Sequence, residues 1–258
     1  INELSDSKYE LQKEQVIDSY NRNKGKAASR VNESTEGPMA DKRIFTFKTR
    51  KQAAAFVKRY NIPVDSQVKQ LLDGKISGVA LGVGNNIKYK GSNITPAIIV
   101  DQTIKENILK SDRKSDGNLI SAFAESHEVT HFILDSMDPK ALANMVGELK
   151  SSLKKSADPK TALMVEFIEA QQAGYKMQGY NQQMLNQEWL TAMGDYIKTQ
   201  EALDVKSPIN DALSDFGKLI NSSIFKSVGY EVDFTTPSSV WSLLKNWDKF
   251  VTSKGSVK

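Results

Sequence analysis

Two histidines are the residues best suited to chemistry, and they lie four apart in His127-Glu128-Val129-Thr130-His131. Residues four apart share one face of an α-helix, so two imidazoles at this spacing can bind one metal ion. Glu128 directly follows the first histidine, which places its carboxylate beside the ion, where it can take a proton from water. Zinc is the favoured metal because it accepts nitrogen and oxygen ligands and leaves one position open. The alternative is a metal-free helix with two partly buried histidines.

A third protein ligand is expected to be a carboxylate, because the chain has no cysteine and no other histidine. We prefer Glu188, which lies far enough downstream for a helical hairpin to intervene. Ala192, one turn later, is small and permits a close approach of helices. Glu166 and Glu169 are the alternative ligands. Asp195 lies on nearly the same helix face as Glu188 and could accept a hydrogen bond from a ligating imidazole.

Periodic patterns predict the elements that position this motif. Apolar residues and the two histidines recur at helical spacing from Asn118 to Leu134. Residues 77–104 alternate between apolar and small or polar side chains, which predicts a hairpin or a three-stranded meander. Within this region, Pro96 predicts that the strand Ile94–Val100 lies at the edge of the sheet.

Capping signals predict the remaining elements. A strand at 44–47 is followed by a helix that begins with the capping-box pair Thr49 and Gln52, and Asp65 caps a second short helix. Asp-Pro pairs at 138–139 and 158–159 start two helices. Further helices are predicted at 182–201, 208–227 and 240–251, and an amphipathic helix is predicted between Tyr9 and Tyr20. Because strands come first and helices follow, the fold class is α+β.

This pattern divides the chain into three parts. Residues 1–42 are expected to form a polar leading segment, either a linker or a pro-segment. Residues 43–110 are expected to form an upper subdomain that contains the sheet. Residues 111–258 are expected to form a helical subdomain that carries the histidine motif.

Composition narrows the classes of function. The chain has 258 residues, a formal net charge of +4 and no cysteine, which excludes disulfide scaffolds, thiolate metal sites and a cysteine nucleophile. No apolar run is long enough to span a bilayer and no signal peptide is visible, so we expect a soluble protein of unassigned compartment. Basic residues with interleaved aromatics lie at 42–59, but the small net charge makes nucleic acid an unlikely partner.

The motif resembles one family of enzymes. His-Glu-Val-Thr-His followed by the downstream sequence Gln-Glu-Trp-Leu-Thr-Ala is similar to the zincin metallopeptidases, specifically the gluzincin type with glutamate as third zinc ligand. Similar short modules occur in secreted bacterial toxins and large phage-encoded proteins. The resemblance covers roughly residues 77–200. It implies a small, mainly antiparallel sheet, then the active-site helix and a helical C-terminal subdomain, with an edge strand, here Ile94–Val100, that binds an extended peptide.

The resemblance also implies a mechanism and its residues. His127, His131 and Glu188 would hold zinc, and Glu128 would act as general base in peptide hydrolysis. A second donor to the developing oxyanion would be Tyr180, with tyrosines 175 and 196 as alternatives. The family's aspartate four residues after the glutamate ligand is replaced here by alanine, which transfers its expected role to Asp195.

The sequence therefore predicts a zinc-dependent metalloendopeptidase that acts on a protein or peptide substrate. The alternative function is a structural or interaction module of a larger assembly, such as a phage virion or polyprotein, with a vestigial metal site. Virion association would then be the expected location.

Overall fold

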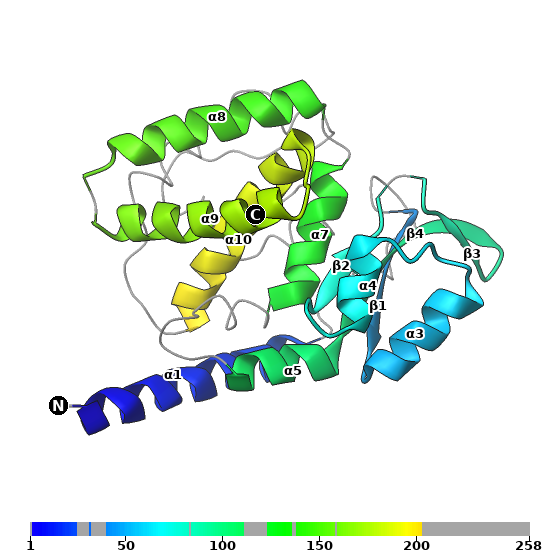
Figure 1. Cartoon of the computed structure of the whole chain (residues 1–258), viewed down its shortest axis with the longest axis horizontal. Coiled ribbons are helices and arrows are strands. Elements are labelled where there is room, and N and C mark those ends of the chain that lie inside the picture. The colour runs from blue at the N-terminus through cyan, green and yellow to red at the C-terminus, as the bar shows by residue number, and fades with distance from the viewer. Residues whose placement is uncertain are drawn as a thin grey trace. The chain divides into compact units, whose positions relative to one another are not determined.

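The computed structural model describes residues 2–24, 31, 40–82, 84–110, 123–135, 138–157 and 159–202. The described elements form two compact units (Figure 1), of which the first contains α1 to α7 and the second contains α8, α9 and most of α10. The helices predicted at 208–227 and 240–251, and the start of the motif helix at 118–122, lie outside the described residues. The domain boundaries proposed from the sequence stay a prediction.

A four-stranded mixed sheet forms the centre of the first unit and confirms the α+β class. Its strand β4 pairs in parallel with β1 and antiparallel with both β2 and β3. The strands are β1 (Lys42–Phe47), β2 (Gly78–Ala80), β3 (Ile87–Tyr89) and β4 (Ser92–Val100). The parallel β1–β4 ladder is the longest of the three and was not predicted from the sequence.

The prediction that Ile94–Val100 is an edge strand is wrong, because β4 lies between β1 and β2. Proline has no N–H to donate, which normally keeps it out of central strands. Here β2 ends at Ala80, just before the position opposite Pro96, so no ladder bond from Pro96 is required. The carbonyl of Pro96 still accepts a hydrogen bond from the Leu81 N–H, at 3.0 Å.

Two short helices pack on one face of this sheet and complete a hydrophobic core. Helix α3 (Arg50–Arg59) begins with the predicted capping box, in which Thr49 and Gln52 bond reciprocally, and α4 (Ser66–Leu72) is capped by Asp65 as predicted. Both caps satisfy N–H groups that a helix start leaves without partners. The core combines residues of α3 and α4 with the inward side of the strands: Phe56, Val57, Val68, Leu71, Val79, Ile87, Ile94, Ile98 and Val100.

The leading segment contains α1 (Asn2–Asn23), which confirms the helix predicted between Tyr9 and Tyr20 but not its amphipathic character, because Leu11 is exposed. Helix α1 contacts α5 (Asp101–Lys110), a helix that directly follows β4 and was not predicted. The Tyr20 hydroxyl donates to the buried carboxylate of Asp101, which also pairs with Lys24. Burial, together with the hydrogen bond to Asp101, raises the pKa of Tyr20 far above its usual value. These contacts attach α1 to the sheet-containing unit.

The described residues of the second unit are mainly helical. They form α8 (Pro139–Lys155), α9 (Pro159–Met177) and most of α10 (Gln182–Ala202). The first two begin at the prolines of the predicted Asp-Pro pairs, and the start of α10 is capped by Asn181, whose side chain accepts from the Met184 N–H at 2.9 Å. Within the described part of the chain, no helix combines the length and apolar character needed to cross a membrane.

Candidate metal centre

Helix α7 (Ala124–Leu134) carries the histidine motif, as the sequence predicts. Three of its residues fix it to the sheet of its own unit. The Glu125 carboxylate accepts a hydrogen bond from Thr46 of β1 at 3.1 Å, and the ring of Phe132 lies 5.8 Å from the Lys42 ammonium, also on β1. Between them on the same helix face, Glu128 lies against β2. The strands therefore hold both ends of the motif helix.

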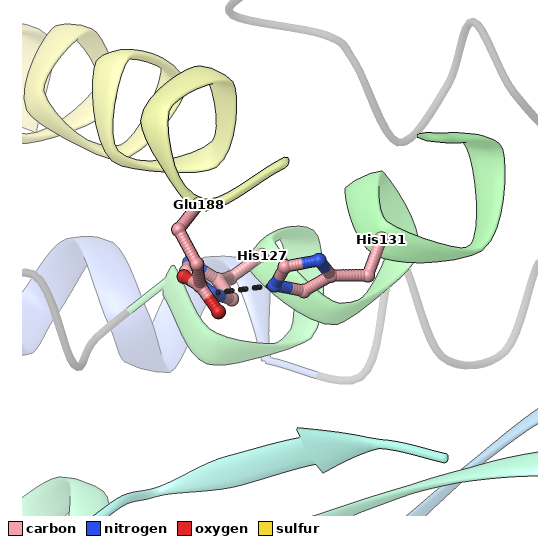
Figure 2. Close-up of side chains that lie close together, drawn as sticks. All are labelled: His127, His131 and Glu188. Atoms are coloured by element: carbon pink, nitrogen blue, oxygen red, sulfur yellow. Dashed lines mark hydrogen bonds between the residues drawn. The ribbon is translucent and has the colours of Figure 1, made fainter. Parts of the chain in front are cut away.

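The two histidines of the motif point their rings at each other (Figure 2). Their Nε2 atoms are 3.1 Å apart, and their ring centroids are 4.8 Å apart. Two nitrogen ligands of one tetrahedral zinc ion, at bonds of about 2.0–2.1 Å, lie about 3.3 Å apart. The pair is therefore already at the separation that a shared zinc ion requires.

Glu188 of α10 belongs to the same group of side chains. One ligand atom from each of His127, His131 and Glu188 lies within 4.8 Å of the others, and Glu188 is buried whereas the two histidines are half-buried. In Figure 2 the carboxylate of Glu188 faces the two rings. Two imidazoles and one carboxylate form a donor set that fits zinc and leaves a fourth position. Among the described residues, these three form a group that could hold a metal ion.

The two alternative carboxylates do not belong to this group. Glu166 and Glu169 lie on exposed positions of α9. Glu169 forms an ion pair with Lys154 of α8 at 3.0 Å, an ordinary surface contact between neighbouring helices of the second unit. The geometry therefore favours Glu188 over both as the third donor.

Glu128 is buried, with 5% of its surface exposed. It lies so close to Gly78 of β2 that a Cβ atom added to this glycine would be 2.5 Å from the Glu128 Oε1. No real side chain tolerates that distance without movement of one partner, so the absence of a Cβ at Gly78 creates the space for the carboxylate. The sequence alone does not reveal this role of Gly78, because a glycine at the start of a short strand carries no local signal of what packs against it.

The other predicted site residues are three tyrosines and one aspartate. Tyr175 and Tyr180 stack on each other, with ring centroids 5.0 Å apart, and Tyr196 packs on Phe167 at 5.6 Å. Asp195 is buried, with 4% of its surface exposed. Their roles in oxyanion stabilisation and in orienting a ligand stay predictions.

Comparison of the chain with protein-family models finds no match, and neither does comparison with curated proteins or with solved structures.

Proposed function

We propose that the chain is a zinc-dependent metalloendopeptidase in which His127, His131 and Glu188 hold the metal and Glu128 is the general base. One observation carries the proposal: the Nε2 atoms of the histidine pair are 3.1 Å apart and form a ligand group with a buried glutamate. A histidine pair with the general-base glutamate of this motif is the arrangement that metal-assisted hydrolysis requires.

When bound, zinc would supply a Lewis acid that polarises the scissile carbonyl and makes water more acidic. The Glu128 carboxylate accepts the proton of the attacking water and passes it to the leaving nitrogen as the peptide bond breaks. Tyr180 is the proposed donor to the oxyanion, with Tyr175 and Tyr196 as alternatives.

The proposed site for the substrate backbone is the edge of β2. Among the described strands, β2 lies at the end of the sheet and pairs with β4 alone. An extended peptide can add to such an edge through main-chain hydrogen bonds. Since Gly78 of this strand is in contact range of the Glu128 carboxylate, a peptide added there would pass close to the general base.

Metal removal and restoration test the proposal. We expect the purified chain to bind about one zinc ion and to cleave fluorescence-quenched peptides, with cleavage lost on dialysis against a chelator and restored by zinc. Zinc binding without cleavage of any peptide in a diverse library would favour the alternative, a structural module with a non-catalytic metal site. If the chain binds neither zinc, cobalt nor manganese, both the peptidase function and the alternative module with a metal site are overturned.

Substitution of Gly78 by alanine tests the contact with the general base. The new methyl group would displace the Glu128 carboxylate, and a misplacement of about 1 Å can lower a rate by about 100-fold. We therefore expect a loss of cleavage of that order with unchanged zinc stoichiometry. Gly82→Ala is the matched control, because a Cβ there would meet no atom within 4 Å. Equal activity of the two variants would contradict this role of Gly78.

A further inference from the structure

Charge is distributed very unevenly along the chain. Residues 42–110, which contain the whole sheet, carry 13 Lys and Arg but 4 Asp and Glu, a net charge of +9. The rest of the chain carries 22 Lys and Arg and 27 Asp and Glu, a net charge of −5. The overall value of +4 therefore conceals a strongly basic sheet region, and basic regions of this kind attract polyanions.

The four carboxylates of this region already have partners. Arg50 forms two hydrogen bonds to Glu106, at 2.7 and 3.2 Å, and Lys69 pairs with Asp73 at 2.6 Å. These hydrogen bonds lower the pKa values of both carboxyl groups. The other two carboxylates of the region are those of Asp101, which contacts Tyr20 and Lys24, and Asp65, which caps α4.

Nine exposed cations of the region form no ion pair with these carboxylates, although Lys75 and Lys110 still act on Asp73 and Glu106 at longer range. Within the described part of the chain none of the following forms an ion pair: Lys48, Lys51, Lys58, Arg59, Lys75, Lys88, Lys90, Lys105 and Lys110. Their charge is available to a partner.

Two of these cations meet two tyrosines where the end of α3 lies beside the β3–β4 hairpin (Figure 1). The Arg59 guanidinium is 5.6 Å from the ring centroid of Tyr60, and the Lys90 ammonium is 5.5 Å from that of Tyr89. The tyrosine rings themselves are 5.9 Å apart and half-buried. We call Arg59, Tyr60, Tyr89 and Lys90 the aromatic–cationic patch. Both rings also pack on the core, Tyr60 on Phe56 at 4.7 Å and Tyr89 on Phe45 at 5.1 Å, so the part of each ring that stays exposed lies beside the two charges.

Lys90 occupies a backbone conformation that does not suit lysine. It has φ 47° and is followed by Gly91 with φ 87°, so both turn residues of the hairpin are left-handed. Asparagine, aspartate and glycine are the residues that normally fill such a turn, since they adopt this conformation at lower cost. A lysine at the tip therefore sacrifices hairpin stability, and strained residues of this kind cluster at functional sites.

We propose that the aromatic–cationic patch binds single-stranded nucleic acid. Arg59 and Lys90 contact phosphates, while Tyr60 and Tyr89 stack against bases, the combination by which single strands are held without sequence preference. An acidic peptide would use the two cations but not the paired rings. The proposal is independent of the proposed peptidase function. It revises the sequence-based expectation that nucleic acid is an unlikely partner, which rested on the net charge of the whole chain.

The test uses the full chain and a fluorescent 20-nucleotide single-stranded DNA of mixed sequence. We expect binding that weakens steeply with salt, because each phosphate contact to a single strand contributes about −0.7 to the slope of log affinity against log salt concentration. Lys90→Asn should reduce that slope by about 0.7 and weaken binding, yet leave the thermal midpoint unchanged or higher, because asparagine suits the turn. Binding loss in this variant thus cannot come from unfolding.

Matched variants complete the design. Lys140→Asn, which removes an exposed lysine of α8, should leave binding unchanged. Tyr89→Leu should weaken binding of single strands at least about tenfold if bases stack there. The proposal is overturned if Lys90→Asn binds as the wild type does, or if Tyr89→Leu has no effect. Equal affinity for poly-glutamate or for duplex DNA of the same length would also overturn it, because either would indicate charge attraction alone.

Discussion

Replacement of Glu128 by glutamine should abolish peptide cleavage and leave zinc binding intact. Glutamine has nearly the same shape but cannot take a proton from water, and general acid–base catalysis contributes about 10²–10⁴-fold to a rate. We expect cleavage to fall by about 10³-fold or more, with about one zinc ion per chain retained. Peptide cleavage kinetics and elemental analysis of the dialysed protein measure the two quantities separately.

Glu125→Gln is the matched control for this variant. Glu125 is also buried and lies one turn earlier on α7, but it accepts a hydrogen bond from Thr46, which the glutamine oxygen can equally accept. This variant should cleave peptides at a rate within about threefold of the wild type, since it removes no proton acceptor from the site. Cleavage by Glu128→Gln at more than a tenth of the wild-type rate would refute the assignment of the general base.

The sequence predicted best those features that depend on neighbours along the chain. The capping box of Thr49 and Gln52, the cap by Asp65 and the helical face shared by His127 and His131 are all set within four residues. Features that depend on distant partners were harder to predict. The parallel pairing of β1 with β4 joins segments separated by about fifty residues, and no local pattern records which strand a given strand will pair with.

Pro96 shows why a valid local rule gave the wrong position for β4. The rule excludes proline where a neighbour needs its N–H, and this need depends on where the neighbouring strand ends. Because β2 ends at Ala80, Pro96 is tolerated in a strand that is paired on both sides. The role of Gly78 was hidden for a similar reason, since its close contact with Glu128 exists only after the helix packs on the sheet.

The expectation that nucleic acid is an unlikely partner rests on a charge summed over the whole chain. The excess of lysine and arginine between 42 and 110 is visible in the sequence, and a local count would have revealed it. The contact between the rings of Tyr60 and Tyr89 could not be predicted from the sequence, because it joins the end of α3 to a hairpin about thirty residues further along the chain.

Substitution of Glu188 should show whether this residue, rather than Glu166 or Glu169, is the third metal ligand. Glu188→Gln keeps the shape but removes the charge and weakens the oxygen as a metal donor. Loss of a partner that only orients a zinc ligand costs about 10–100-fold in affinity, so loss of a direct ligand should cost at least about 100-fold. Isothermal titration of the metal-free protein with zinc, in the presence of a competing chelator, measures this change.

Two further variants make the result specific to the metal. Glu169→Gln, which breaks only the surface pair with Lys154, should bind zinc as the wild type does. Glu188→His replaces the carboxylate by an imidazole, another good zinc ligand, and should restore much of the affinity that Glu188→Gln loses. If Glu188 were needed only for the structure of the helix, histidine would not replace it and zinc affinity would stay low in Glu188→His. Wild-type zinc affinity in Glu188→Gln, together with weakened affinity in Glu166→Gln or Glu169→Gln, would transfer the third ligand to α9.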